Sequence, residues 1–84
     1  MTYNTDKKSN LRKMRKKKNI TQEELSKKSG VSARTIRAYE EKSREIDKAT
    51  MSILVDLCIA LDCDISDILE SETAIKKYKI VKRF

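Results

Sequence analysis

The sequence predicts an all-α fold, a compact domain of five helices, from three features of the chain. The 84 residues contain one glycine, Gly30, which stands between two stretches with the character of helices, and they contain no proline. Thr21 and Ser32 each stand directly before one of these stretches, where a helix N-cap is expected. Apolar residues recur at helical spacing along residues 49–61.

The first helix is expected to begin within residues 6–9 and to end at Lys18. Leu11 and Met14 would face the core of the domain. Asn19 would stop the helix in the place of the more usual glycine.

The second helix is predicted by a capping box. The hydroxyl of Thr21 can accept a hydrogen bond from the amide of Glu24, and the Glu24 carboxylate can accept one from the amide of Thr21. Ile20 and Leu25 have the spacing of the accompanying hydrophobic staple. The helix would end at Gly30, which can adopt a positive φ without steric cost.

The third helix is expected to start directly after Ser32, again with a staple, here between Val31 and Ile36. Only Val31 separates Gly30 from this next cap. Two helices joined by so short a connection cannot run antiparallel, and they must turn at a steep angle. The sequence therefore predicts a helix-turn-helix.

The fourth helix is expected over residues 49–61, with a core stripe of Met51, Leu54, Cys58 and Leu61. Further apolar residues widen this stripe almost to the full circumference: Ile53, Val55, Leu57 and Ile59. A helix so apolar is expected to be buried on more than one side, in part against a partner.

A short fifth helix is predicted to follow Asp64 as its N-cap, with Ile65, Ile68 and Leu69 facing inward. The tail that follows alternates weakly between apolar and polar residues. A strand, a helical extension and a disordered tail all stay open for it.

The net charge of +7 is distributed unevenly. Residues 1–22 carry +7 and residues 23–48 carry +1, whereas residues 49–72 carry −6 and residues 73–84 carry +5. A domain that turns one face toward nucleic acid and another away from it can use such a pattern. With no apolar run near the start and none long enough to cross a bilayer, we expect a cytoplasmic, nucleoid-associated protein without a membrane partner.

The third helix has two distinct faces at helical spacing. Ile36 and Tyr39 point one way with Glu40 beside them, whereas Arg34 and Arg37 point the other way. Arginine near a helix N-terminus is unfavourable for the helix dipole. It is explained if this end of the helix inserts among phosphates and base edges.

The stretch ITQEELSKKSGVSARTIRAYEE resembles the lambda-repressor-like, Xre-type and Cro-type family of bacterial and phage DNA-binding domains. The resemblance extends over residues 7–70, where NLRKMRKKKNITQEEL is similar to the first helix and MSILVDLCIALDCDISDILE to the fourth and fifth. Ser26 departs from the alanine usual at the helix crossing, and the loop EKSREIDK is longer than usual. The domain organisation expected is an arm at 1–6, the helix-turn-helix domain at 7–70 and a basic tail at 71–84 that contacts a second copy or a partner.

The third helix would lie in the major groove. Arginine can donate a pair of hydrogen bonds to guanine, and the resemblance places two alanines where a methyl group meets a thymine methyl. The residues expected to contact bases are Ala33, Arg34, Arg37 and Ala38.

The DNA backbone is expected to meet the N-terminus of the second helix, where the Gln22 side chain and the free amides suit a phosphate. Lysines at the end of the first helix are more typical of a solvated helix end and would add salt-dependent attraction. The backbone candidates are Gln22, Thr35, Arg44, Lys16 and Lys17. Gly30 would be a structural turn residue, and the resemblance implies a structural salt bridge between Arg15 and Glu40.

Neither catalysis nor a metal site is predicted. The chain has no histidine, and its two cysteines, Cys58 and Cys63, fit a core stripe and a staple position opposite Ile68. A redox-sensor role for the pair stays open as the minor alternative. We expect no cofactor and no enzymatic activity.

The function predicted is sequence-specific binding of double-stranded DNA by a small transcriptional regulator, acting as a repressor and as a homodimer. Its dimer surface is expected among Ile53, Ile59, Leu69, Ile75, Tyr78, Ile80 and Phe84. The main alternative is an antitoxin, which binds a partner protein and represses its own operon. A non-specific nucleic-acid or RNA binder is disfavoured, because one Phe, three Tyr and no Trp offer little stacking surface.

Overall fold

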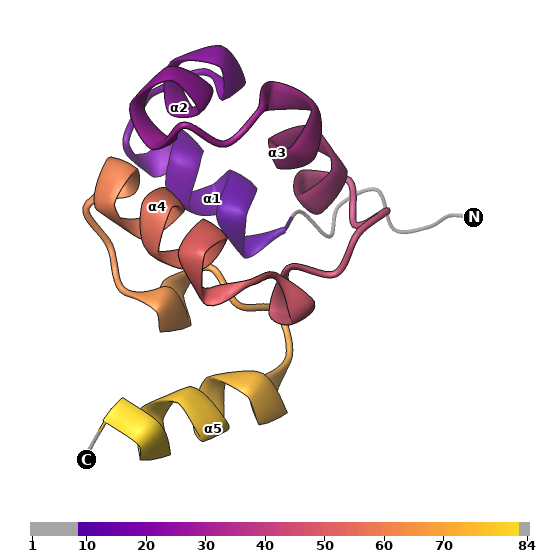
Figure 1. Cartoon of the computed structure of the whole chain (residues 1–84), viewed down its shortest axis with the longest axis vertical. Coiled ribbons are helices and arrows are strands. Elements are labelled where there is room, and N and C mark those ends of the chain that lie inside the picture. The colour runs from indigo at the N-terminus through magenta and orange to yellow at the C-terminus, as the bar shows by residue number, and fades with distance from the viewer. Residues whose placement is uncertain (1–8, 83–84) are drawn as a thin grey trace.

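A computed structural model describes residues 9–82, which form five α-helices and two short 3-10 helices (Figure 1). The elements are α1 (Asn10–Lys17), α2 (Gln22–Ser29), α3 (Ala33–Glu40), η1 (Ile46–Lys48), α4 (Met51–Leu61), η2 (Ile65–Asp67) and α5 (Glu72–Lys82). The all-α prediction is confirmed. The arm expected at 1–6 and the tail residue Phe84 lie outside the described residues.

Side-chain caps fix where the first two helices begin. The amide of Arg12 donates to the Ser9 hydroxyl at 3.0 Å, so that the N-cap of α1 lies within the predicted window and the helix begins one residue after it, at Asn10. Asn19 ends this helix with a φ of 60°. The capping box of α2 is complete, because the Glu24 amide donates to the Thr21 hydroxyl at 3.0 Å and the Thr21 amide donates to the Glu24 carboxylate at 2.7 Å.

Gly30 makes the turn between α2 and α3 with a φ of 79° and a ψ of 1°. Its amide donates to the Ser26 carbonyl at 2.8 Å, and Ser32 then caps α3. A Cβ atom built on Gly30 would meet nothing within 4 Å. The turn therefore needs glycine for its backbone conformation and not for lack of space.

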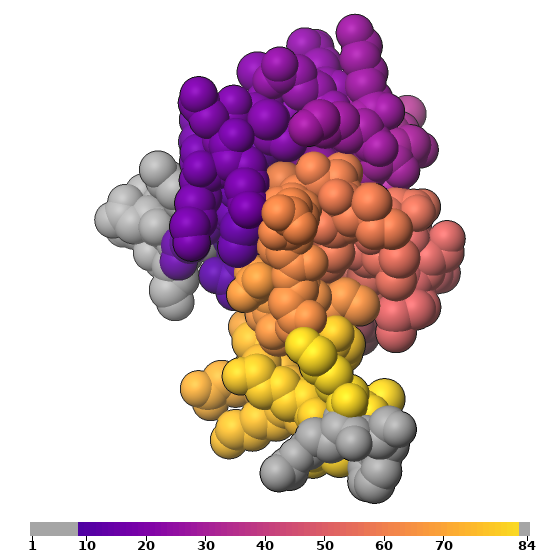
Figure 2. Space-filling model, turned by 90° about the vertical axis from the view of Figure 1, so that its left-hand side faces the viewer, coloured from indigo at the N-terminus to yellow at the C-terminus, as the bar shows by residue number. Residues whose placement is uncertain are grey.

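One hydrophobic core lies between the helices. Its fully buried members come from α1, α2, α3, α4 and the segment after η2: Leu11, Leu25, Ile36, Leu57, Leu61 and Ile68. The staple residue Val31 is buried beside them. This core holds α2 on α4 and α3 on α2 and α1, with α2 at the far end of the molecule from α5 (Figures 1 and 2).

The predicted stripe of α4 is partly wrong. The helix begins at Met51 after its N-cap Thr50, and the Met51 side chain is 60% exposed because the first turn projects beyond the core. Leu57, and not Met51, is a fully buried residue of this helix. Ile59 on the opposite side is 73% exposed. The helix is therefore buried on one face within the described residues, and its other face is open.

The fifth helix is not the one that was predicted. Asp64 caps only the single 3-10 turn of η2, after which Ile68 and Leu69 enter the core. The amides of Glu70 and Ser71 then donate to the Asp47 carboxylate at 2.8 and 3.0 Å, which holds the chain in a non-helical turn. Leu69 faces inward as expected, and with 4% of its surface exposed it does not belong to the expected dimer surface.

The tail forms the fifth helix, α5, which lies below the body of the domain (Figure 1). The Asp64 carboxylate accepts hydrogen bonds from the Tyr78 hydroxyl at 3.2 Å and the Lys82 ammonium at 3.0 Å. Hydrogen bonds from Ser66 and then Lys82 lower the pKa of Asp64 to about 2. Ile75 and Tyr78 are half-buried against the core, so that α5 is attached at its inner side.

Substitutions at Gly30 should destabilise the domain in an order set by the cost of a positive φ. Gly30→Ala should lower the free energy of unfolding by about 1–2 kcal/mol and Gly30→Val by more, whereas Gly30→Asn should cost least. Asn19 already adopts such a φ in this chain. Thermal and urea unfolding of the three variants measure the order, and equal stabilities would contradict this account of the turn.

Candidate nucleic-acid interface

The two faces of α3 differ in exposure as well as in composition. Ile36, Tyr39 and Glu40 are buried, whereas Arg34 and Arg37 are exposed. The other residues of α3 that were predicted to contact DNA are half-buried: Ala33, Thr35 and Ala38. Among the described residues, no carboxylate lies within ion-pair distance of either arginine. The outer face of α3 thus exposes two guanidinium groups without an ion-pair partner in the described part of the chain. The side chains around them are small and project little from the helix.

A groove of about 320 Å³ brings the N-terminus of α2 beside α3. Ala33 and Arg37 line it from α3, and Thr21, Gln22 and Glu23 line it from the start of α2. Two predicted base-contact residues and one predicted backbone-contact residue therefore share one surface. A phosphate at this place would lie between a helix N-terminus and a guanidinium group.

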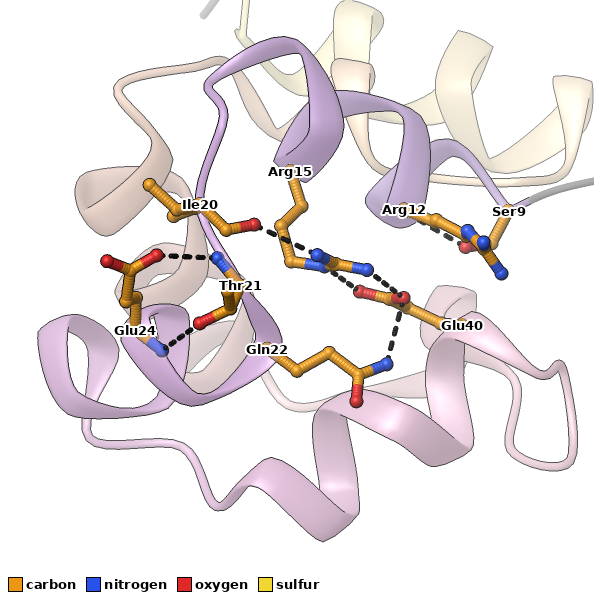
Figure 3. A network of polar contacts seen from close by, with 8 residues as sticks. All are labelled: Ser9, Arg12, Arg15, Ile20, Thr21, Gln22, Glu24 and Glu40. Atoms are coloured by element: carbon orange, nitrogen blue, oxygen red, sulfur yellow. Dashed lines mark hydrogen bonds and ion pairs between the residues drawn. The ribbon is translucent and has the colours of Figure 1, made fainter.

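A buried polar network lies beneath this groove and joins α1, α2 and α3 (Figure 3). Arg15 donates to Glu40 through two nitrogens, with Nε 2.7 Å from Oε2 and Nη2 3.0 Å from Oε1. The third nitrogen, Nη1, donates to the carbonyl of Ile20 at 2.9 Å. Gln22 donates from Nε2 to Glu40 Oε1 at 3.1 Å.

The burial of this network makes its geometry important for stability. The side chains of Arg15 and Glu40 are only 8% and 2% exposed. Hydrogen bonding to Glu40 raises the pKa of Arg15, against the opposite effect of burial. A buried charge without its partner is strongly unfavourable, so that α3 is held at one orientation relative to α1 and to the start of α2.

The side chain and the main chain of Gln22 face different partners at the start of α2. Its amide group bonds to Glu40, and it is the backbone amides of Gln22 and Glu23 that lack an intrahelical partner. The Glu24 amide is already satisfied by Thr21. The part of α2 that suits a phosphate is therefore the main chain of its first turn.

The remaining backbone candidates lie apart from this groove. Arg44 follows α3, and its guanidinium lies 5.3 Å from the centre of the Tyr39 ring. Lys16 and Lys17 are exposed at the end of α1, and the next residue, Lys18, donates to the carbonyl of Asp62 beyond α4. The structure does not bring these two lysines to the surface shared by α2 and α3.

A second cavity near Arg44 was not predicted from the sequence. It measures about 280 Å³ and includes Lys48 and the α4 N-cap Thr50. Thr50 was a recognisable helix cap, but its proximity to Arg44 depends on how the loop after α3 folds back. The amides of Ser43 and Arg44 both donate to the Ala38 carbonyl, which makes this turn.

Neither a metal-binding cluster nor a membrane span is found within residues 9–82. There, no group of three or more His, Cys, Asp or Glu side chains is placed to hold a metal ion. None of the helices described is both long and apolar enough to span a bilayer.

Comparison with known proteins gives one match. A family model described as helix-turn-helix matches residues 11–68, which include α1 to α4 and η2. The comparison with curated proteins returns no match, and neither does the comparison with solved structures. The matched region contains the groove between α2 and α3 and the buried network below it.

The network should show strong energetic coupling. Arg15→Met and Glu40→Leu should each lower the free energy of unfolding by about 3–5 kcal/mol, because each leaves a buried charge unpaired. The double variant should lose far less than the sum of the two losses. Urea unfolding of the four proteins measures this coupling.

Lys17→Met is the matched control on the same helix, and it should change the free energy of unfolding by less than about 0.5 kcal/mol. Additive effects of the Arg15 and Glu40 substitutions would show that the pair does not fix the helices.

Proposed function

The chain belongs to the Xre-type, lambda-repressor-like helix-turn-helix family of DNA-binding regulators, and on this premise we propose that it reads the major groove of double-stranded DNA with α3. The observation that supports the proposal is the groove in which Ala33 and the exposed Arg37 of α3 lie beside the first residues of α2, with Arg34 exposed on the same helix. A regulator with this arrangement acts through occupancy of its operator, most directly as a repressor. The protein would act at the nucleoid, in the cytoplasm.

The two parts of the surface would have separate tasks. Hydrogen bonds to phosphate fix the position of the protein on the duplex, whereas contacts to base edges provide sequence discrimination. Arg34 and Arg37 project from α3, and the guanidinium fork matches the O6 and N7 atoms of guanine. Ala33 and Ala38 leave room for the groove floor to approach the helix and can contact thymine methyl groups. Arg44 and Thr35 would add backbone contacts at the flanks of α3.

DNA affinity should fall steeply with salt concentration. Each phosphate neutralised by Lys or Arg releases counterions, so that the logarithm of affinity falls with the logarithm of salt with a slope of about −0.9 per phosphate contact. Fluorescence anisotropy with a labelled duplex at increasing salt measures the slope. A slope near zero would contradict duplex DNA as the partner.

Replacement of Arg34 and replacement of Gln22 should have different effects on DNA affinity and base preference. Arg34→Ala should lose about 1–3 kcal/mol of binding free energy on the preferred site and relax the preference at one base pair. Gln22→Ala should weaken binding to all sequences by a similar and smaller factor, because it disturbs the start of α2 and not a base contact. Affinity profiles over every single-base variant of a selected operator measure both effects.

The control for lost charge is Lys79→Ala, which removes an exposed cation from α5. It should leave the base preference intact. If Arg34→Ala also kept the full preference, the specificity would have to come from Arg37, from the two alanines or from DNA shape.

We propose further that the protein binds its operator as a homodimer. One recognition helix reads only a few base pairs, and two of them define a useful site. Large apolar side chains are exposed on α4 and α5, away from α3: Met51, Val55, Ile59, Ile80 and Val81. This set replaces most of the expected surface, because Leu69 is in the core and Ile53, Ile75 and Tyr78 pack against it.

The selected operator should be an inverted repeat with half-site centres about 34 Å apart, one turn of the duplex. Ile59→Lys should weaken dimerisation and cooperative binding, with little effect on binding to a single half-site, because Ile59 is exposed and far from α3. Sedimentation of the complex gives its stoichiometry. One chain bound to one asymmetric site would contradict the homodimer.

An antitoxin role is the second candidate, since the same exposed apolar residues of α4 and α5 would suit a partner protein. Both roles share the DNA surface and differ in what covers α5. Co-purification with the product of the neighbouring reading frame distinguishes them.

A further inference from the structure

The C-terminal end of α4 brings the two cysteines together. Asp62 adopts a left-handed conformation with a φ of 52°. The Cys63 amide donates to the Cys58 carbonyl at 3.1 Å, and the Asp62 amide donates to the Ile59 carbonyl at 3.3 Å. This pair of hydrogen bonds is a Schellman motif, in which the side chains at the first and sixth positions meet. Here both of these side chains carry thiols, and both cysteines are free.

The two thiols differ in how solvent reaches them. Cys58 is buried, and Cys63 is half-buried. Both line an open groove of about 410 Å³ between α4, η2 and α5, whose walls include Val55, Ile59 and Tyr78. A small reagent that enters this groove therefore meets the half-buried Cys63 more readily than the buried Cys58.

The electrostatic environment favours Cys63 as the attacking group. The Cys58 thiol lies within hydrogen-bonding reach of the Cys63 sulfur, and this hydrogen bond lowers the pKa of Cys63 against the effect of burial. The charge of Asp67 raises this pKa and Lys18 lowers it, with the Lys18 ammonium 3.3 Å from the carbonyl of Asp62, while Asp64 raises it slightly. The same hydrogen bond and burial raise the pKa of Cys58.

We propose that Cys58 and Cys63 are a reactive dithiol, which a low-molecular-weight disulfide oxidises to an intramolecular disulfide at the end of α4. In the first step, the Cys63 thiolate attacks one sulfur of the small disulfide, and a mixed disulfide forms while one small thiolate leaves. In the second step, Cys58 gives up its proton and attacks the Cys63 sulfur, and the second small thiolate leaves. The two cysteines are oxidised by two electrons, and the small disulfide is reduced to two thiols.

The position of the pair connects its chemistry to α5. Cys63 directly precedes Asp64, whose carboxylate binds Tyr78 and Lys82 of that helix. Tyr78 also lines the groove that the small molecule must enter. An adduct on Cys63 therefore lies in the groove that Tyr78 of α5 also lines.

The test uses the folded full chain, oxidised glutathione in excess and intact-mass spectrometry. The unchanged chain should accumulate little glutathione adduct. Its final mass should be lower by two hydrogen atoms, as expected for a closed intramolecular disulfide. Cys58→Ser should accumulate one stable glutathione adduct, because it lacks the resolving thiol. Cys63→Ser should react at least about 10-fold more slowly than Cys58→Ser, because only the buried thiol remains.

A second measurement keeps the proposal testable if a serine variant loses helicity. The unchanged chain is oxidised, the remaining thiols are blocked, and the protein is cleaved on the N-terminal side of Asp62, which separates the two cysteines. The fragments should stay joined until a reductant is added. A stable glutathione adduct on the unchanged chain, disulfides mainly between chains, or equal rates for the two serine variants would each overturn the proposal.

Discussion

The buried contact of Arg15 with Glu40 and Gln22 is the interaction on which the rest of the site depends. It joins α1, the first residue of α2 and the last residue of α3 through one carboxylate. Because both charges are almost fully enclosed, small rotations of α3 would break hydrogen bonds that water cannot replace. Gly30 gives α3 its steep angle, and the network fixes that angle. The outer face of α3 and the free amides of α2 consequently stay on one surface.

The fold separates charge in the way a DNA-binding domain needs. Arg15 and Glu40 pair with each other in the interior. Arg34 and Arg37 are exposed and have no carboxylate partner in the described part of the chain. The acidic residues of 49–72 lie from α4 to the start of α5, and among them Asp64 caps η2 and binds Tyr78 and Lys82 of α5. The helices α4 and α5 therefore form a second surface, with exposed apolar residues and the dithiol groove, that is independent of α3. Binding of DNA and contact with another protein can thus use different surfaces of one small domain.

Sequence reasoning succeeded where short-range chemistry decides the structure. The capping box at Thr21 and the turn at Gly30 involve residues within four positions of each other, and the sequence displays them directly. It failed where tertiary packing decides: the helix expected after Asp64 is only one 3-10 turn, because Asp47 binds the amides of Glu70 and Ser71 across more than twenty residues. The bond between Gln22 and Glu40 was missed for the same reason. The contact of the two thiols depends on the left-handed conformation of the aspartate between them, which no spacing rule predicts.

The central claim is that α3 and the start of α2 form one DNA-binding surface, held by the network beneath. Amide chemical shifts of isotope-labelled protein, followed during titration with its selected duplex, test this claim most directly. The account predicts that the largest changes occur at Gln22, Glu23 and the amides of α3 from Ala33 to Arg37, with small changes along α5. The largest changes along the basic helix α5, with α3 unaffected, would contradict it.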